Sequence, residues 1–216
     1  MQNIDIRTLL AKSTYNIHHK KRERAVYYND GHYIKLWVKD WEHCNVARHG
    51  FDIGYYDEKN APACLAFVVD VDGKSDLGYV MKKGNVTGGS KDSWAKLIEM
   101  TSLDQRKSFI REVFDRSRLH SCIVSDMCPA NVIVSDEEIS LIDYEGLGSF
   151  NWFFNGQPEE WEAQSRNLKK CPNPYWRDMS KYLKRYVKEC LDISFDKDIS
   201  TVDAFNELYE LIKEAT

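Results

Sequence analysis

The pattern of apolar and polar residues changes along the chain, and its first part has the short period of strands. Short apolar stretches bounded by turn residues predict strands at residues 4–11, 25–28, 33–38, 64–71 and 77–81. The pair Asp30-Gly31 favours a tight hairpin turn between two of them. Residues 12–22 form a polar stretch, and residues 39–49 fit a short helix that ends at Gly50. This part of the chain predicts a β-rich half with one helix.

Beyond the glycine-rich segment 83–89 the apolar spacing becomes helical. Ser102 and Gln105 make a capping box at the start of a long helix. Later helices are expected to begin at Pro158, at Pro174 and after Thr201. The residues at helical spacing, which form the expected buried faces, are Leu103, Ile110, Val113, Phe114, Ser117, Trp176, Met179, Leu183, Val187, Cys190, Phe205, Leu208, Tyr209 and Ile212. Strands followed by helices predict an α+β fold, and the glycine-rich segment marks its best domain boundary.

The segment from Cys122 to Gly148 is predicted to be a β-hairpin with its flanking loops. Two stretches rich in β-branched residues, 132–134 and 139–142, flank the polar turn 135–138. A tight hairpin brings the residues that enter its first strand close to the residues that leave its second strand. We therefore expect polar groups from two parts of this segment to meet at one end of the ribbon.

Three polar residues occupy that end of the predicted hairpin. Asp126 lies in the loop before the first strand, Asn131 at its entrance, and Asp143 at the exit of the second strand. Acceptor oxygens gathered in this way suit Mg²⁺, which takes one or two carboxylates and completes its coordination with phosphate oxygens and water. Phosphoryl transfer also needs a residue that orients the acceptor hydroxyl and takes its proton. Asp126 is the candidate for that role, and a simple turn residue is the alternative.

The spacing of these residues resembles that of the protein-kinase-like phosphotransferases. Asp126 and Asn131 have the D-x-x-x-x-N interval of a kinase catalytic loop, and Asp143 stands where that superfamily carries its metal-binding aspartate. The stretch also resembles small bacterial kinase-like proteins of the PhoP regulatory network and the aminoglycoside- and choline-kinase-like enzymes. The resemblance implies ATP and Mg²⁺ as cofactors. It also implies a bilobal fold, with a small β-rich N-lobe at residues 1–83 and a mostly helical C-lobe at residues 84–216.

Lys35 matches the strand lysine that holds nucleotide phosphates in that superfamily. It alternates with apolar neighbours, so its side chain is expected to point away from the face that they bury. The alternative is a lysine on the solvated side of a sheet. The resemblance implies a glutamate partner on the following helix. Glu42 is the best candidate, and Asp52 or Glu58 could replace it.

The remaining site residues follow from the resemblance. Glu145 adds a third oxygen ligand for the metal, or is an exposed glutamate at the start of a loop. The usual glycine-rich loop is absent, and Ser13 and Thr14 occupy its expected place as phosphate contacts. Adenine is expected to pair with the backbone from Met81 to Lys83.

Departures from the family pattern shape the functional hypothesis. Val124-Ser125 replaces the usual His-Arg pair, and no A-P-E motif follows, so the platform for peptide substrates is missing or rebuilt. The aromatic stretch 150–154 is either an acceptor pocket or core. We therefore expect an ATP- and Mg²⁺-dependent kinase whose hydroxyl acceptor is a carbohydrate or another small molecule. The alternatives are a minimal atypical protein kinase, a nucleotide-binding pseudokinase and a nucleotidyl transferase of the same fold.

Composition restricts the partners. With 216 residues and a net charge of -4, the chain offers no electrostatic reason to bind nucleic acid. The basic run 18–22 is either a solvated loop or a phosphate contact. Its 6 cysteines include no C-x-x-C pair, which argues against structural zinc and for reduced thiols in the core. No signal peptide or membrane span is recognisable, and a cytoplasmic location is expected.

Overall fold

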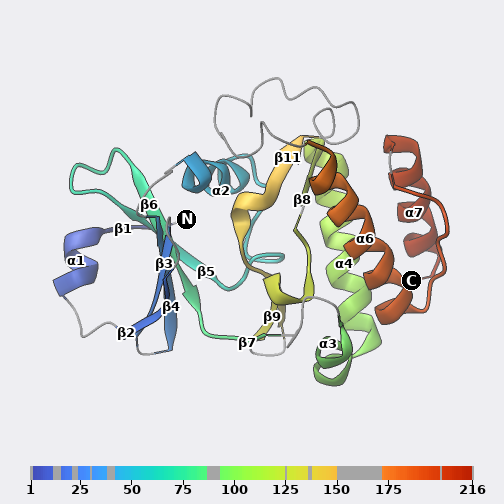
Figure 1. Cartoon of the computed structure of the whole chain (residues 1–216), viewed down its shortest axis with the longest axis horizontal. Coiled ribbons are helices and arrows are strands. Elements are labelled where there is room, and N and C mark those ends of the chain that lie inside the picture. The colour runs from blue at the N-terminus through green and yellow to red at the C-terminus, as the bar shows by residue number, and fades with distance from the viewer. Residues whose placement is uncertain are drawn as a thin grey trace.

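The first part of the chain folds into a six-stranded sheet with the order β1-β5-β6-β4-β3-β2 (Figure 1). The structure, a computed structural model, describes residues 2–11, 16–20, 24–29, 31–37, 42–86, 93–124, 126–135, 138–149, 172–199 and 201–215. The strands are β1 (Gln2–Asp5), β2 (Asn16–Lys20), β3 (Arg24–Asn29), β4 (His32–Trp37), β5 (Cys64–Val69) and β6 (Asp76–Lys82). β1 runs parallel to β5, and the other neighbours pair antiparallel.

The start of the chain differs from the strand predicted over residues 4–11. β1 ends at Asp5, and the helix α1 (Ile6–Ala11) follows it. Ile6 and Leu9 are three residues apart, which suits one face of a helix, and both pack against a small apolar cluster of strand residues. The polar stretch 12–22 contains β2, so the sheet gains a strand that composition did not predict.

The helix α2 (Glu42–Asp52) runs through Gly50, where the sequence predicted its end. Gly50 has a packing role instead, because a Cβ atom there would lie 2.5 Å from the Tyr56 ring. The guanidinium of Arg48 pairs with the Asp76 carboxylate on β6 and lies 3.9 Å from the centre of the Phe67 ring. These contacts hold α2 on the sheet.

The predicted hairpin is present and belongs to a second, smaller group of strands. β9 (Val132–Ser135) and β10 (Glu138–Leu141) pair antiparallel, and β7 (Asn85–Val86) joins the other edge of β9. β8 (Cys122–Val124) pairs with β11 (Leu147–Ser149). The short 3-10 helices η1 (Pro129–Asn131) and η2 (Tyr144–Gly146) flank the hairpin. Because β7 follows β6 closely, the chain passes from the large sheet to the hairpin immediately after Lys82.

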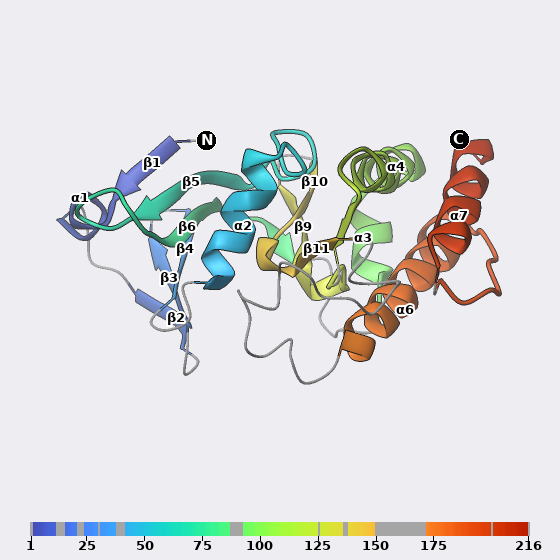
Figure 2. The same ribbon diagram turned by 90° about the horizontal axis from the view of Figure 1, so that it is seen from above.

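The helices α3 (Ala95–Met100), α4 (Leu103–His120), α6 (Pro172–Leu191) and α7 (Val202–Glu214) lie on the far side of the hairpin (Figures 1 and 2). The Ser102–Gln105 capping box is present, and Thr201 caps α7. Leu103, expected on the buried face of α4, is exposed in its first turn. α6 begins two residues before the predicted Pro174. The helix expected from Pro158 and the aromatic stretch 150–154 fall outside the described residues. Among the helices that the structure describes, none combines the length and the hydrophobicity of a membrane span.

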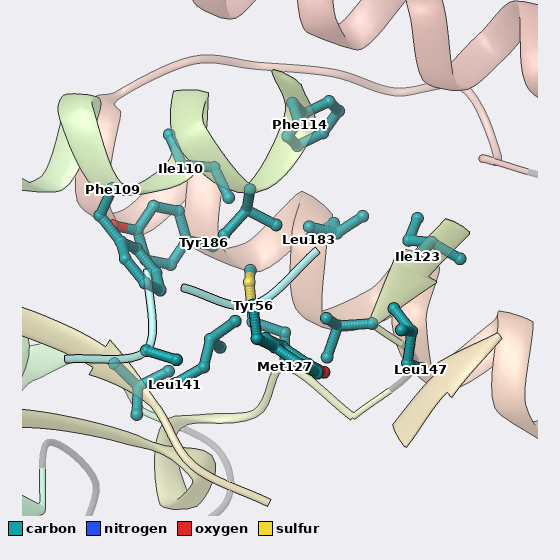
Figure 3. Packing of buried hydrophobic residues seen from close by; sticks show 14 of the residues in the cluster. Tyr56, Phe109, Ile110, Phe114, Ile123, Met127, Leu141, Leu147, Leu183 and Tyr186 are labelled. Carbon is teal, nitrogen blue, oxygen red and sulfur yellow. The ribbon is translucent and has the colours of Figure 1, made fainter. Parts of the chain in front are cut away.

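The larger apolar cluster is continuous from the sheet to the helices. Figure 3 shows its central part, where Met127, from the loop before η1, lies among side chains of α4, α6 and β10. The segment after α2 completes the connection. The Tyr55 hydroxyl lies 2.9 Å from the Ser117 hydroxyl on α4, and the Asn60 carbonyl accepts a hydrogen bond from Leu141 of β10. The core therefore has no break at the predicted domain boundary.

Five cysteines in the described ranges are free and buried: Cys44, Cys64, Cys122, Cys128 and Cys190. The interpretation of these residues as core-filling thiols is confirmed. Burial raises the pKa of the Cys64 thiol to about 12, so it is protonated and unreactive near neutral pH.

We expect Arg106→Met to destabilise the protein without touching the hairpin. The buried Arg106 guanidinium donates to carbonyl oxygens of Ile98, Thr101 and Cys190, and so ties α3 and α4 to the end of α6. Without it these acceptors lose their partner in the interior, which is expected to lower the free energy of unfolding by about 3 kcal/mol.

Denaturant unfolding measures this effect. Arg111→Met makes the same change at an exposed position of α4 and should alter stability by less than about 0.5 kcal/mol. Equal stability of the two variants would contradict the structural role of Arg106.

Candidate active site

Lys35 lies on β4 with its side chain enclosed, 6% exposed. Its residue partner across the antiparallel pair is Tyr79 of β6. The ammonium lies 5.0 Å from the centre of the Trp37 ring and 5.6 Å from that of the Tyr79 ring. The alternative of a lysine on the solvated side of the sheet is therefore wrong.

The Lys35 ammonium has three acceptors. It forms ion pairs with Asp143 Oδ1 and Glu145 Oε1, and its distance to the Tyr79 hydroxyl is 3.3 Å. The same hydroxyl donates to Glu145 Oε2 at 3.0 Å. Since an ammonium has three N–H groups, these contacts satisfy it fully. A strand lysine and two acidic residues more than a hundred positions later thus form one cluster.

The hairpin brings the other predicted residues to the same end of the ribbon. The Asn131 carbonyl accepts a hydrogen bond from the backbone of Ile142 at 2.8 Å, which sets Asn131 beside the residue that precedes Asp143. The Asn131 side-chain amide donates to the Asp126 carbonyl at 2.9 Å. Asn131 therefore connects the loop that carries Asp126 with the strand exit that carries Asp143.

Asp143 adopts a left-handed backbone conformation, with φ 71° and ψ 56°. Aspartate tolerates this region better than most residues, and such conformations often occur at functional sites. Tyr144 next to it is buried between the rings of Phe51, Tyr56 and Tyr79, with centroid distances of 5.0–5.3 Å. The buried Tyr144 anchors η2, and Asp143 and Glu145 on either side of it both reach Lys35.

The charges of the cluster do not balance, because two carboxylates face one ammonium. Burial, and next the neighbouring Asp143 carboxylate, raise the pKa of Glu145 to about 7, while Lys35 opposes this shift. Burial, followed by the charges of Glu145 and Asp143, raises the pKa of Tyr79 well above its usual value. The Tyr79 hydroxyl consequently keeps its proton and remains a hydrogen-bond donor.

Among the described side chains, Asp143 and Glu145 pair with Lys35, whereas the candidates Asp52 and Glu58 do not. Asp52 and Glu58 lie at the end of α2 and in the segment after it, where they line an open cavity of about 1020 Å³. Glu42 begins α2, and its side chain is outside the described part of the structure. Glu145, predicted as a metal ligand, is the glutamate that contacts Lys35. Its alternative interpretation as an exposed loop residue is wrong, because its side chain is only 13% exposed.

The predicted nucleotide contacts are described only in part. Ser13 and Thr14 fall outside the described residues. Met81 is buried at the end of β6, and Lys83 is exposed just beyond it. The Lys83 N–H donates to the Gly31 carbonyl at 2.8 Å, so the protein already uses that donor.

Tyr79 is the functional candidate that the sequence analysis did not find. Its place opposite Lys35 depends on the register of β4 and β6, and no local spacing encodes that register.

The oxygen donors at this end of the hairpin suit a cation that completes its coordination with oxygens of a bound small molecule. Across the described ranges, no group of three or more His, Cys, Asp or Glu side chains could hold a metal ion alone. Asn131 and Asp143 supply oxygen donors at one end of the hairpin. Mg²⁺ commonly binds through one or two carboxylates together with substrate phosphates, rather than in an all-protein cage. The residues present therefore suit Mg²⁺ bound together with a phosphate-bearing ligand.

Comparisons with known proteins gave the following results. No family model matches the chain, and no curated protein matches it. Among solved structures, the co-crystal structure of WbdD and the kinase inhibitor LY294002 is similar, with a TM-score of 0.43 and 17% sequence identity. The match covers 92% of this chain and 45% of the other chain. This chain thus spans less than half the length of that protein.

Proposed function

We propose that this chain is an ATP- and Mg²⁺-dependent phosphotransferase of protein-kinase-like fold. It transfers the γ-phosphate to a hydroxyl group, and its acceptor is a carbohydrate or another small molecule. The observation that carries the proposal is the buried Lys35 ammonium between Asp143 and Glu145, at the hairpin end where Asn131 holds the loop of Asp126. A buried cation beside acidic oxygens suits a polyphosphate that binds together with a hard cation.

The roles of the residues follow from their chemistry. Lys35 binds phosphate oxygens, Asn131 and Asp143 hold Mg²⁺, and Asp126 takes the proton of the acceptor hydroxyl. When bound, Mg²⁺ neutralises negative charge on the phosphates. Asp143 now pairs with Lys35, so in this proposal it exchanges that partner for the metal, while Glu145 stays with Lys35.

The proposed division into an N-lobe at residues 1–83 and a C-lobe at residues 84–216 agrees with the position of the large sheet, which ends at Lys82. The base would lie at the joint between Met81 and Lys83. The Lys83 N–H already donates to the Gly31 carbonyl, so the hydrogen bonds to the base would come from backbone carbonyl groups and from residues beyond Lys83.

Lys35→Met tests the proposal. A lysine that binds phosphates contributes charge-assisted hydrogen bonds, so we expect kcat/KM for ATP to fall roughly ten- to hundredfold. The substitution also leaves two carboxylates without their ammonium, and the free energy of unfolding should fall by roughly 3 kcal/mol. Activity is therefore measured per folded molecule, with Mg²⁺, ATP and a panel of hydroxyl acceptors, by mass spectrometry of the products.

Lys184→Met is the matched control, since it makes the same change at a half-buried lysine of α6 that pairs with Asp198, in the helical part of the molecule. Its activity should stay within about twofold of the wild type. If Lys35→Met keeps full activity per folded molecule, Lys35 has only a structural role. If the wild type binds ATP but phosphorylates neither small molecules nor proteins, the pseudokinase alternative replaces the proposal.

A further inference from the structure

Tyr79 is fixed beside Lys35 by the sheet itself. The two residues are partners across the antiparallel pair of β4 and β6. Tyr79 is fully buried, and its ring lies against Trp37, Phe67 and Tyr144, with centroid distances of 5.5, 6.2 and 5.1 Å. Close packing on several sides leaves the ring a single orientation, so the position of its hydroxyl is set by the core.

The three acceptors of the Lys35 ammonium come from two different parts of the fold. Asp143 and Glu145 stand at the end of the hairpin, around η2. Tyr79 stands on the same sheet as Lys35 and is the uncharged member of the three. If Asp143 gave up its contact, the ammonium would keep Tyr79 and Glu145 as partners.

The Tyr79 hydroxyl also organises Glu145. It accepts from Lys35 at 3.3 Å and donates to Glu145 Oε2 at 3.0 Å, while Glu145 Oε1 takes the ion pair. One hydroxyl therefore holds the ammonium and the carboxylate in a fixed mutual arrangement. This matters because Glu145 is largely buried and needs partners for both of its oxygens.

We propose that Tyr79 is a positioning residue that locks Lys35 and Glu145 into one unit. This rests on the proposed function, in which Asp143 leaves Lys35 for the metal. The ammonium then keeps Tyr79 and Glu145 as partners, and its free N–H group is directed at the phosphates. Tyr79 acts through Lys35 and Glu145 and does not contact the reacting atoms.

The test compares Tyr79→Phe with a matched control, Tyr186→Phe. Both tyrosines are fully buried, and each substitution removes one hydroxyl that donates a hydrogen bond. The Tyr186 hydroxyl donates to the Arg106 carbonyl at 3.0 Å, in the helical part of the molecule. A structural effect of losing a buried hydroxyl should appear equally in the melting curves of both variants.

The first readout is independent of activity. Acetylation of Lys35 by an N-hydroxysuccinimide ester is followed by peptide mass spectrometry, with and without MgATP. The reagent acylates the amine after it has lost its proton, and N-hydroxysuccinimide leaves. Tyr79→Phe removes a hydrogen-bond acceptor that holds the protonated Lys35 side chain in place, so it should raise the Lys35 rate about five- to tenfold, while Tyr186→Phe leaves it unchanged. The second readout is kinetic. The KM for ATP should rise about five- to tenfold in Tyr79→Phe, with a change in kcat of less than about threefold.

A second variant shows whether Tyr79 acts through Glu145. Glu145→Gln should also raise the Lys35 acetylation rate. Adding Tyr79→Phe to it should increase the rate by less than about twofold, because residues of one network are not additive. If the two substitutions raise the acetylation rate of Lys35 independently, so that their factors multiply in the double variant, the proposal is overturned. It is also overturned if Lys35 is acetylated at the same rate in Tyr79→Phe and in Tyr186→Phe. If Tyr79→Phe does not fold, wild-type rates in Glu145→Gln overturn the proposal and raised rates support it.

The proposed function has its own, separate outcome in the same experiment. MgATP should slow acetylation of Lys35 in the wild type, since phosphates would cover the ammonium. Absence of protection by MgATP contradicts the phosphotransferase proposal. The proposal about Tyr79 is tested separately, by the acetylation rates of Lys35 measured without nucleotide.

Discussion

Asp126→Ala should reduce phosphoryl transfer by about 10²–10⁴-fold and leave ATP affinity unchanged. A general base acts in the transfer step rather than in holding the nucleotide. The structure explains why the loop should survive the substitution. Asn131 bonds to the backbone carbonyl of Asp126, and alanine keeps that carbonyl. The half-buried carboxylate can therefore be removed without releasing the contact that holds the loop against the hairpin.

Turnover and ATP affinity are measured together on purified Asp126→Ala. The control is Asp72→Ala, the same change in the exposed turn between β5 and β6, which should alter neither quantity. Full activity of Asp126→Ala would remove this residue from the mechanism. An equal loss of ATP affinity and turnover would place it in nucleotide binding instead.

Much of the fold could be predicted because its signals are local. The capping box at Ser102 and the β-branched stretches of the hairpin act within a few residues, and the structure confirms both. The errors lie where tertiary contacts override such signals. Gly50 suggests a helix end, but the Tyr56 ring needs the space beside it, and the helix continues. Residues 4–11 are apolar enough for a strand, but the spacing of Ile6 and Leu9 suits a helix that covers the sheet.

The same distinction between local signals and tertiary contacts applies to the candidate site. The interval between Asp126 and Asn131 and the hairpin after it predict a shared end, and the structure has that geometry. The contact of Glu145 with Lys35 could not be predicted, since the two residues are 110 positions apart and no local spacing encodes such a contact. Strand register, which no short motif encodes, decides the position of Tyr79.

The placement of Glu145 has a consequence for how the site is assembled. In the sequence-based expectation the partner of Lys35 came from the helix after its strand, so the position of that helix would control the site. In the structure the partner and Asp143 belong to one short turn around η2. The buried Tyr144 between them fixes the backbone of this turn, from which both acidic side chains reach Lys35.

Asp143→Asn should lower the Mg²⁺-dependent part of ATP affinity by at least about 100-fold, because it removes the carboxylate that we propose to bind Mg²⁺. ATP binding without Mg²⁺ should change by less than about threefold, since Lys35 keeps its other contacts. Stability should shift by less than about 1 kcal/mol, because asparagine tolerates the left-handed conformation at φ 71° and the ammonium retains Glu145.

Asp192→Asn is the matched control, with the same change at φ 59° in an exposed position after α6. Calorimetric titrations with ATP, in the presence and absence of Mg²⁺, measure the two ATP affinities of each variant. Equal losses in the presence and absence of Mg²⁺ would show that Asp143 binds no metal, and the Lys35 cluster would then be an ion-pair network of the fold.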